Sequence, residues 1–188
     1  MMDKIFVFRV ILDTADDDIF RDIEIVGSQT LEDLHKGILD AFGIAPGEMA
    51  SFYASDDNWN QGDEVPLIDM GFGKYTMGLM SEMKLEDWVA KIGKRSLYLY
   101  DYLNMWTFFV ELFSTKEEDL SKKMIVITSN FPKTVYVYGQ NPKHAPEKNF
   151  GDEQKQESKG LFDDAFDNDE DDEFGDDEQS FNDYHDEW

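Results

Sequence analysis

The sequence predicts an α+β domain followed by an acidic C-terminal tail, and three patterns support this fold class. Short runs of β-branched and aromatic residues, bounded by turn residues, predict strands. Among them, residues 31–42 place apolar side chains at helical spacing. Beyond residue 152 apolar residues become sparse and acidic residues dominate, a composition that does not support a packed core. We therefore expect one folded domain over residues 1–152 and a disordered acidic tail over residues 153–188.

The chain opens with two apolar runs, residues 5–12 and 19–26, which flank consecutive aspartates and predict a β-hairpin. The helix that follows begins after Thr30, which forms a capping-box pair with Asp33, and ends at a glycine. A hairpin followed by an amphipathic helix that packs across it is a β-grasp, or ubiquitin-like, opening. Arg21 shares a strand face with isoleucines, so we expect it at the sheet rim or with its stem lying over the core.

The remaining elements extend this opening with further antiparallel strands. We expect a strand at 50–54, a long connection over 55–80 held down by large apolar side chains, a short helix at 85–92, a hairpin of strands 97–102 and 106–113, and later strands at 124–128 and 135–138. The long connection is the segment best suited to cover a groove.

The charge of the chain restricts its partners. It has 42 acidic and 17 basic residues and a formal net charge of −25. Residues 159–188 hold 14 of the acids and one lysine, so residues 1–158 are acidic as well. The largest basic cluster is Lys91 with Lys94 and Arg95, a small footprint for a phosphate backbone. We expect no nucleic-acid binding that is independent of sequence.

Two further absences in the sequence narrow the class of protein. No cysteine is present, which excludes disulfides, thiolate nucleophiles and cysteine-ligated zinc. The first apolar run is interrupted by Arg9 and followed by acids, unlike a secretion signal, and no stretch is long enough to span a bilayer. We expect a cytoplasmic protein without a membrane partner.

Two residues are candidates for catalysis. His35 lies on or beside the apolar stripe of the first helix and would act as a ligand or general base, with Asp101 as its orienting carboxylate. The alternative is a partly buried structural histidine and an aspartate that caps a turn. Motifs of phosphate loops, serine hydrolases and zinc proteases are absent, and the acids of residues 56–64 lack EF-hand spacing. We predict no cofactor, no metal, and a solvated acidic loop.

Four stretches carry a family resemblance. Residues 20–25 are similar to a second-strand pattern W-R-R-I-x-V with its tryptophan replaced, and residues 30–43 closely match a helix pattern T-L-x-D-L-H-x-x-I-x-x-A-F-G. Residues 98–108 align with Y-x-Y-D-F-G-D-x-W-x-H, and residues 145–151 retain part of P-P-E-D-x-G-G. Together they resemble the plasmid pRiA4b ORF-3-like family, small bacterial and archaeal α+β proteins without an established biochemical role.

The third stretch shows where this chain departs from the family. Tyr100, Asp101 and Trp106 match the pattern, whereas its glycine, second aspartate and histidine are replaced by Leu103, Asn104 and Phe108. If the family's aspartate and histidine form a polar or metal site, that site is lost here. Some relatives carry a mobile-element association, but the sequence has no recombinase constellation of serine and arginine.

These observations favour a non-enzymatic binding or adaptor module that contacts a protein partner, with the acidic and aromatic tail as a second contact. The residues predicted for the binding surface are Arg21, Trp59, Tyr100, Asp101 and Trp106. The first alternative is a metal-dependent or hydrolytic enzyme that uses His35 and Asp101. The second is a mobile-element regulator that acts on nucleic acid.

Overall fold

A computed structural model describes residues 2–15, 17–71, 77–120 and 131–146. Its elements in chain order are β1 (Asp3–Leu12), β2 (Ile19–Val26), α1 (Leu31–Phe42), β3 (Ala50–Ser55), β4 (Gln61–Pro66), α2 (Leu85–Ile92), β5 (Arg95–Tyr100), β6 (Trp106–Glu118) and β7 (Lys133–Tyr138). They belong to one unit, Met1–Glu147. None of the described helices is long and apolar enough to cross a membrane.

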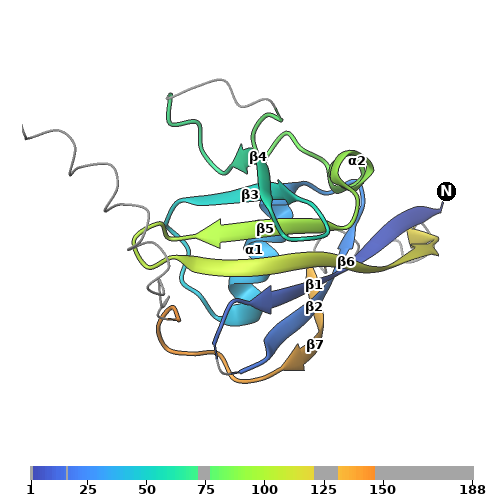
Figure 1. The fold of residues 1–188 in the computed structure, drawn as a ribbon. Coiled ribbons are helices and arrows are strands. Elements are labelled where there is room, and N and C mark those ends of the chain that lie inside the picture. The colour runs from blue at the N-terminus through green and yellow to red at the C-terminus, as the bar shows by residue number, and fades with distance from the viewer. Residues whose placement is uncertain (1, 16, 72–76, 121–130, 147–188) are drawn as a thin grey trace, which may run out of the picture. The chain divides into compact units, whose positions relative to one another are not determined.

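The strands form one seven-stranded sheet in the order β4-β3-β5-β6-β1-β2-β7, and every neighbouring pair is antiparallel. Figure 1 shows β4 and β7 at opposite ends of this sheet, with α1 behind it. The predicted first hairpin is β1–β2, and the predicted second hairpin is β5–β6. The mixed α+β class predicted from the sequence is therefore confirmed.

The helix α1 forms where the sequence predicts it. Thr30 accepts a hydrogen bond from the backbone of Asp33, whose side chain accepts one from the backbone of Thr30, and Gly43 ends the helix in the left-handed conformation. The apolar stripe of α1 packs on one face of the sheet, and Leu85 and Trp88 of α2 join the same core cluster. The core therefore lies on this inner face of the sheet.

Residues of the outer face alternate with those of the core. The strand β5 shows this directly, since Tyr98 and Tyr100 are buried while Leu97 and Leu99 are half-buried. On the outer face, the ring of Trp59 in the turn after β3 packs against that of Phe109 on β6. This leaves two distinct surfaces, one closed by α1 and one formed by the sheet itself.

The long connection expected over residues 55–80 is partly wrong, because β4 lies within it and pairs with β3. The residues of β4 include glycine and two acids, which are rare in strands, so their pattern does not predict a strand. The strand β6 also continues past Phe113 to Glu118 because it pairs with the start of β1. The predicted strand 124–128 and the predicted tail lie outside the described residues.

Candidate functional site

His35 is held inside the core by aromatic neighbours. Its side chain is buried, and its Nδ1 lies 2.7 Å from the hydroxyl of Tyr98. Burial lowers the pKa of His35 from 6.5 to about 4. The charges of Glu32 and Lys36 have smaller effects on this pKa, since Glu32 raises it and Lys36 lowers it. The imidazole is therefore neutral at pH 7 and links α1 to β5.

Asp101 stabilises the turn between β5 and β6. Its Oδ1 accepts hydrogen bonds from the backbone of Leu103 and Asn104, and its Oδ2 accepts one from the side chain of Asn104. The Asn104 hydrogen bond is the largest cause of its lowered pKa. Asp101 also has a φ of 56°, which aspartate tolerates in turns. Both carboxylate oxygens thus have partners within the turn.

Tyr100 and Arg21 each connect separate segments beneath α1. The Tyr100 hydroxyl donates to the carbonyl of Ala45 at 2.6 Å and accepts from the backbone of Glu48. Arg21 is 2% exposed and donates to the carbonyls of Ala41, Phe20, Tyr138 and Gly139 and to Oδ1 of Asn141. The guanidinium lies 4.8 Å from the ring of the core residue Phe42, so Arg21 extends over the core, which is the second of its two expected positions. Its hydrogen bonds also tie β7 to β2 and to the end of α1.

The two predicted tryptophans lie on opposite faces of the sheet. Trp106 is nearly buried and stacks beside Phe108 in the core. Trp59 lies on the outer face, with its ring 4.9 Å from that of Phe109 and with the Arg95 guanidinium 5.0 Å above it. Among the six predicted residues, the structure brings His35 and Tyr100 together, with ring centroids 6.0 Å apart. The six residues as a set do not converge on one cleft.

An aromatic row crosses the outer face towards β7. Arg9 is bonded to Asp22 at 2.8 and 2.9 Å, and its guanidinium lies between the rings of Phe20 and Phe113. The ring of Phe20 in turn stacks with those of Tyr136 and Tyr138 on β7. The rings of Phe113, Phe20 and Tyr138 therefore line up across the outer face, with Arg9 between the first two.

The edge strand β7 is unusually apolar for an exposed strand. Val135, Tyr136, Val137 and Tyr138 are between 41% and 59% exposed, and in the described part of the chain β7 pairs with β2 alone. Val137 pairs with Arg21 and so lies on the α1 face, whereas the two tyrosines lie on the outer face. Both faces of this edge therefore present apolar surface.

A cluster of hydroxyl groups around a carboxylate lies on the outer face near β4, the edge strand opposite β7. Ser51 donates to Glu64 Oε1 at 2.6 Å, and the Tyr53 hydroxyl donates to the same oxygen at 3.2 Å. The Tyr102 hydroxyl lies 2.6 Å from Ser51 Oγ and 3.5 Å from Glu64 Oε1. Burial is the main cause of the raised pKa of Tyr53, which keeps its hydroxyl a donor.

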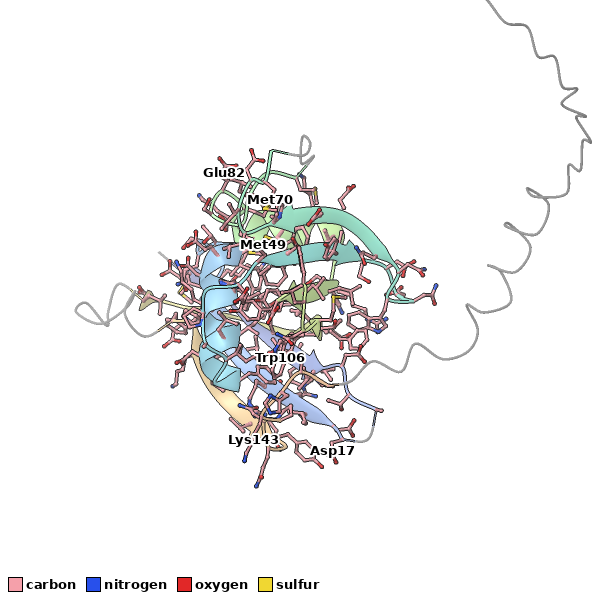
Figure 2. The ribbon with its side chains drawn as sticks, turned by 90° about the vertical axis from the view of Figure 1, so that its left-hand side faces the viewer. Asp17, Met49, Met70, Glu82, Trp106 and Lys143 are labelled. Carbon is pink, nitrogen blue, oxygen red and sulfur yellow. The ribbon has the colours of Figure 1, made fainter. Side chains whose placement is uncertain are left out.

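This cluster borders a cavity of about 250 Å³. Its lining residues are Met49, Ala50, Glu64, Pro66, Ile68, Met70 and Tyr102. Figure 2 shows Met49 and Met70 at the same end of the molecule. Sequence reasoning missed this site, because it placed Glu64 in a solvated loop. The signal was the alternation of Ser51 and Tyr53 along a predicted strand, which puts two hydroxyls on one face.

The acidic loop expected over residues 56–64 is partly wrong, because residues 61–64 belong to β4 and residues 56–60 form the turn between β3 and β4. Asp56 organises it, since its Oδ1 accepts from the backbone of Asn58 and Asn60 and its Oδ2 from the Asn60 side chain. In the described ranges, no group of three or more histidine, aspartate or glutamate side chains is placed to hold a metal ion.

Comparisons with known proteins identify the fold and the family of the chain. No curated protein matches it. A solved structure, a protein of unknown function from Methanosarcina mazei Go1, matches with a TM-score of 0.57 and 19% identity, over 73% of this chain and 71% of that one, which shows a shared fold. The family model of the plasmid pRiA4b ORF-3-like protein matches residues 4–173. The chain therefore belongs to the plasmid pRiA4b ORF-3-like family.

Proposed function

We propose that this protein is a non-enzymatic binding module that recruits an extended segment of a partner protein to the edge strand β7. The observation that carries the proposal is the exposure of four consecutive apolar residues, 135–138, on a strand at the end of the sheet. Exposed edge strands are templates for pairing with another chain, and proteins use them to bind extended peptides.

The chemistry of the partner follows from the two faces of β7. A strand paired with β7 would place alternate side chains beside Val137 on one face of the sheet and beside Tyr136 and Tyr138 on the other. Valine suits the first contact, and the tyrosine rings accept a lysine through cation–π attraction. The net charge of −25 disfavours a second copy of the chain and favours a basic partner. The occupant we propose is an extended segment with alternating apolar and basic residues.

The enzyme alternative has less support. His35 Nδ1 is bonded to Tyr98, and both Asp101 oxygens are bonded within their turn. A regulator that binds nucleic acid would need available cations. Instead Arg9, Arg95 and Lys116 form ion pairs with acids on the described surface.

The proposal extends to features of the chain beyond this edge. We infer that β1, β2 and α1 form a β-grasp-like opening on which the later strands were added, and that the protein works in the cytoplasm. The acidic segment 153–188 would add long-range attraction for the same basic partner.

The test uses a synthetic peptide of about eight residues with alternating lysine and valine, long enough to span a strand. Its binding to the full chain is measured by fluorescence anisotropy. We expect Val137→Lys to weaken binding by about tenfold, or about 1.4 kcal/mol. The matched control is Leu103→Lys, which adds the same charge at a residue that is 93% exposed in the β5–β6 turn. We expect this control to bind like the natural chain.

A second peptide separates strand pairing from charge attraction. It has the same composition, with the lysines and valines in two blocks. Equal binding of both peptides, or equal weakening by the Val137 and Leu103 substitutions, would contradict pairing at β7. A concentration-dependent dimer without peptide, abolished by Val137→Lys, would show that a second copy is the occupant and would also contradict the proposed partner.

A further inference from the structure

We propose that the cavity bordered by Glu64 and Tyr102 is a binding site for an alkylammonium group, either a lysine side chain or a free aliphatic amine. This site is separate from the β7 edge and does not rest on the function proposed above. It lies against β3 and β4 at the opposite end of the sheet.

The first support is the orientation of the Glu64 carboxylate. Ser51 and Tyr53 donate hydrogen bonds to Oε1, the Tyr102 hydroxyl lies 3.5 Å from the same oxygen, and no described residue donates to Oε2. Because Ser51 has one hydroxyl proton and donates it to Glu64, the 2.6 Å contact with Tyr102 requires the Tyr102 hydroxyl to donate to Ser51. Ser51 and Tyr53 therefore hold the carboxylate in place, Tyr102 orients Ser51, and Oε2 is left for a cationic donor.

The second support is the apolar character of the other walls. Met49, Pro66, Ile68 and Met70 line the cavity, which suits a stem of methylene groups. The Tyr102 ring adds a face that attracts an ammonium ion. At about 30 Å³ for each water-sized group, 250 Å³ holds about eight heavy atoms. A butylammonium ion fits that space.

The combination of a single carboxylate with an apolar cavity predicts which ligands the site selects. An acidic surface attracts every cation, but this site combines one charge with contact for an aliphatic chain. A neutral alcohol of the same length would leave Oε2 without a charged partner. The site therefore predicts preference for a cation that carries an apolar stem.

The test is an NMR titration of the full chain labelled at its methionine methyl groups. The nine methionines include Met49 and Met70 in the cavity wall and Met2, which lies before β1. We expect n-butylammonium chloride to shift the Met49 and Met70 signals in a saturable way and to leave Met2 unchanged. n-Butanol and ammonium chloride, as the apolar and ionic controls, should produce little shift.

The variant that tests the carboxylate is Glu64→Gln, which keeps an oxygen to accept from Ser51 and Tyr53. We expect at least about tenfold weaker binding of butylammonium. The matched control is Asp63→Asn, which removes the same charge from the neighbouring exposed residue that borders the separate hollow near Lys91. It should bind like the natural chain. Equal binding of butylammonium by Glu64→Gln, or of butanol by the natural chain, would overturn the proposal.

A second variant does not depend on the stability of the hydroxyl cluster. Ile68 is 58% exposed at the cavity, so Ile68→Lys places a tethered ammonium at its mouth. We expect Ile68→Lys to exclude butylammonium and Ile68→Gln to retain most of the binding. Undiminished binding by Ile68→Lys would contradict the site.

The source of the ammonium is distinguished by a third ligand, N-acetyl-lysine methylamide. If it binds at least as tightly as butylammonium, the site recognises a lysine side chain. If butylammonium alone binds, the site recognises a free amine. Both results support the alkylammonium site, and binding of neither overturns it.

Discussion

The two edges of the sheet are built differently. On β4, Gly62 and Asp63 are exposed and have low strand propensity, and the strand ends at Pro66, which has no N–H to offer. These features discourage the addition of another strand. On β7 the sequence Val-Tyr-Val-Tyr of residues 135–138 is exposed and strongly β-prone. The contrast indicates that a partner strand would add at β7 and not at β4.

The attachment of each edge to the domain also differs. The end of β7 depends on the buried Arg21, whose guanidinium reaches the carbonyls of Tyr138 and Gly139 and the side chain of Asn141. Ahead of β7, Pro132 packs so closely on α1 that a Cβ at Gly37 would lie 2.5 Å from the Pro132 ring. On the other side, the buried hydroxyl of Ser51 and the half-buried Tyr53 on β3 donate to Glu64 on β4. Strand β7 is therefore anchored in the core and exposed at its outer edge.

The largest expected effect comes from removing the anchor of β7. Arg21→Met leaves several buried carbonyls without a donor, and we expect a loss of about 3–5 kcal/mol in the free energy of unfolding. Arg95→Met is the control near the β4 end, because Arg95 is partly exposed and pairs with Glu111. It should cost at most about 1 kcal/mol. Urea denaturation compares them, and similar losses would show that Arg21 does not anchor the strand.

A fall in pH should decrease the free energy of unfolding, because His35 is buried in its neutral form in the core between the two edges. The folded-state pKa of His35 is about 4 and its ordinary value is 6.5. Below pH 6.5 the unfolded chain binds a proton that the folded chain excludes, so stability decreases as the pH falls towards 4. The loss approaches about 3 kcal/mol.

His35→Gln provides the comparison, because glutamine retains a polar group for Tyr98 but does not titrate. Subtracting its urea-derived stability from that of the natural chain at several pH values removes the contribution of the many carboxylates. The difference should change between pH 6.5 and 4. A constant difference across this range would contradict the buried, neutral histidine.

A smaller effect is expected at the turn that follows β7. Gly139 has a φ of 74°, and a Cβ there would lie 2.8 Å from the carbonyl oxygen of Asp18. We expect Gly139→Ala to cost about 2 kcal/mol. Gly71→Ala is the control near β4, since Gly71 has a φ of 73° but no atom within 4 Å of its Cβ position. It should cost about 1 kcal/mol. Equal thermal shifts would show that the contact with β2 is unimportant.

The sequence predicted the parts of the fold that rest on local signals. The capping box at Thr30 and the apolar stripe of α1 define the helix before any tertiary contact forms. The hairpin β1–β2 likewise follows from two apolar runs and a polar turn. Strand β4 could not be predicted in this way, because Gly62 and Asp63 have low strand propensity and their conformation is set by pairing with β3.

The candidate sites depended on contacts between distant residues. Asp101 is explained by its own turn, and a turn-capping role was one of the two expectations from sequence. The Glu64 cluster joins residues from β3, β4 and the turn after β5, and such convergence is not visible along the chain. The environment of Arg21 likewise required the position of the segment that follows β7.

Amide hydrogen exchange of both edges, with and without the alternating lysine–valine peptide, is the decisive test of strand addition at β7. We expect exchange to slow at residues 133–138 of β7 when the peptide is present and to stay unchanged at residues 61–66 of β4. The same protection should be lost in Val137→Lys and retained in Leu103→Lys. Protection of β4 instead of β7, or of neither edge at saturating peptide, would contradict a binding module that works through β7.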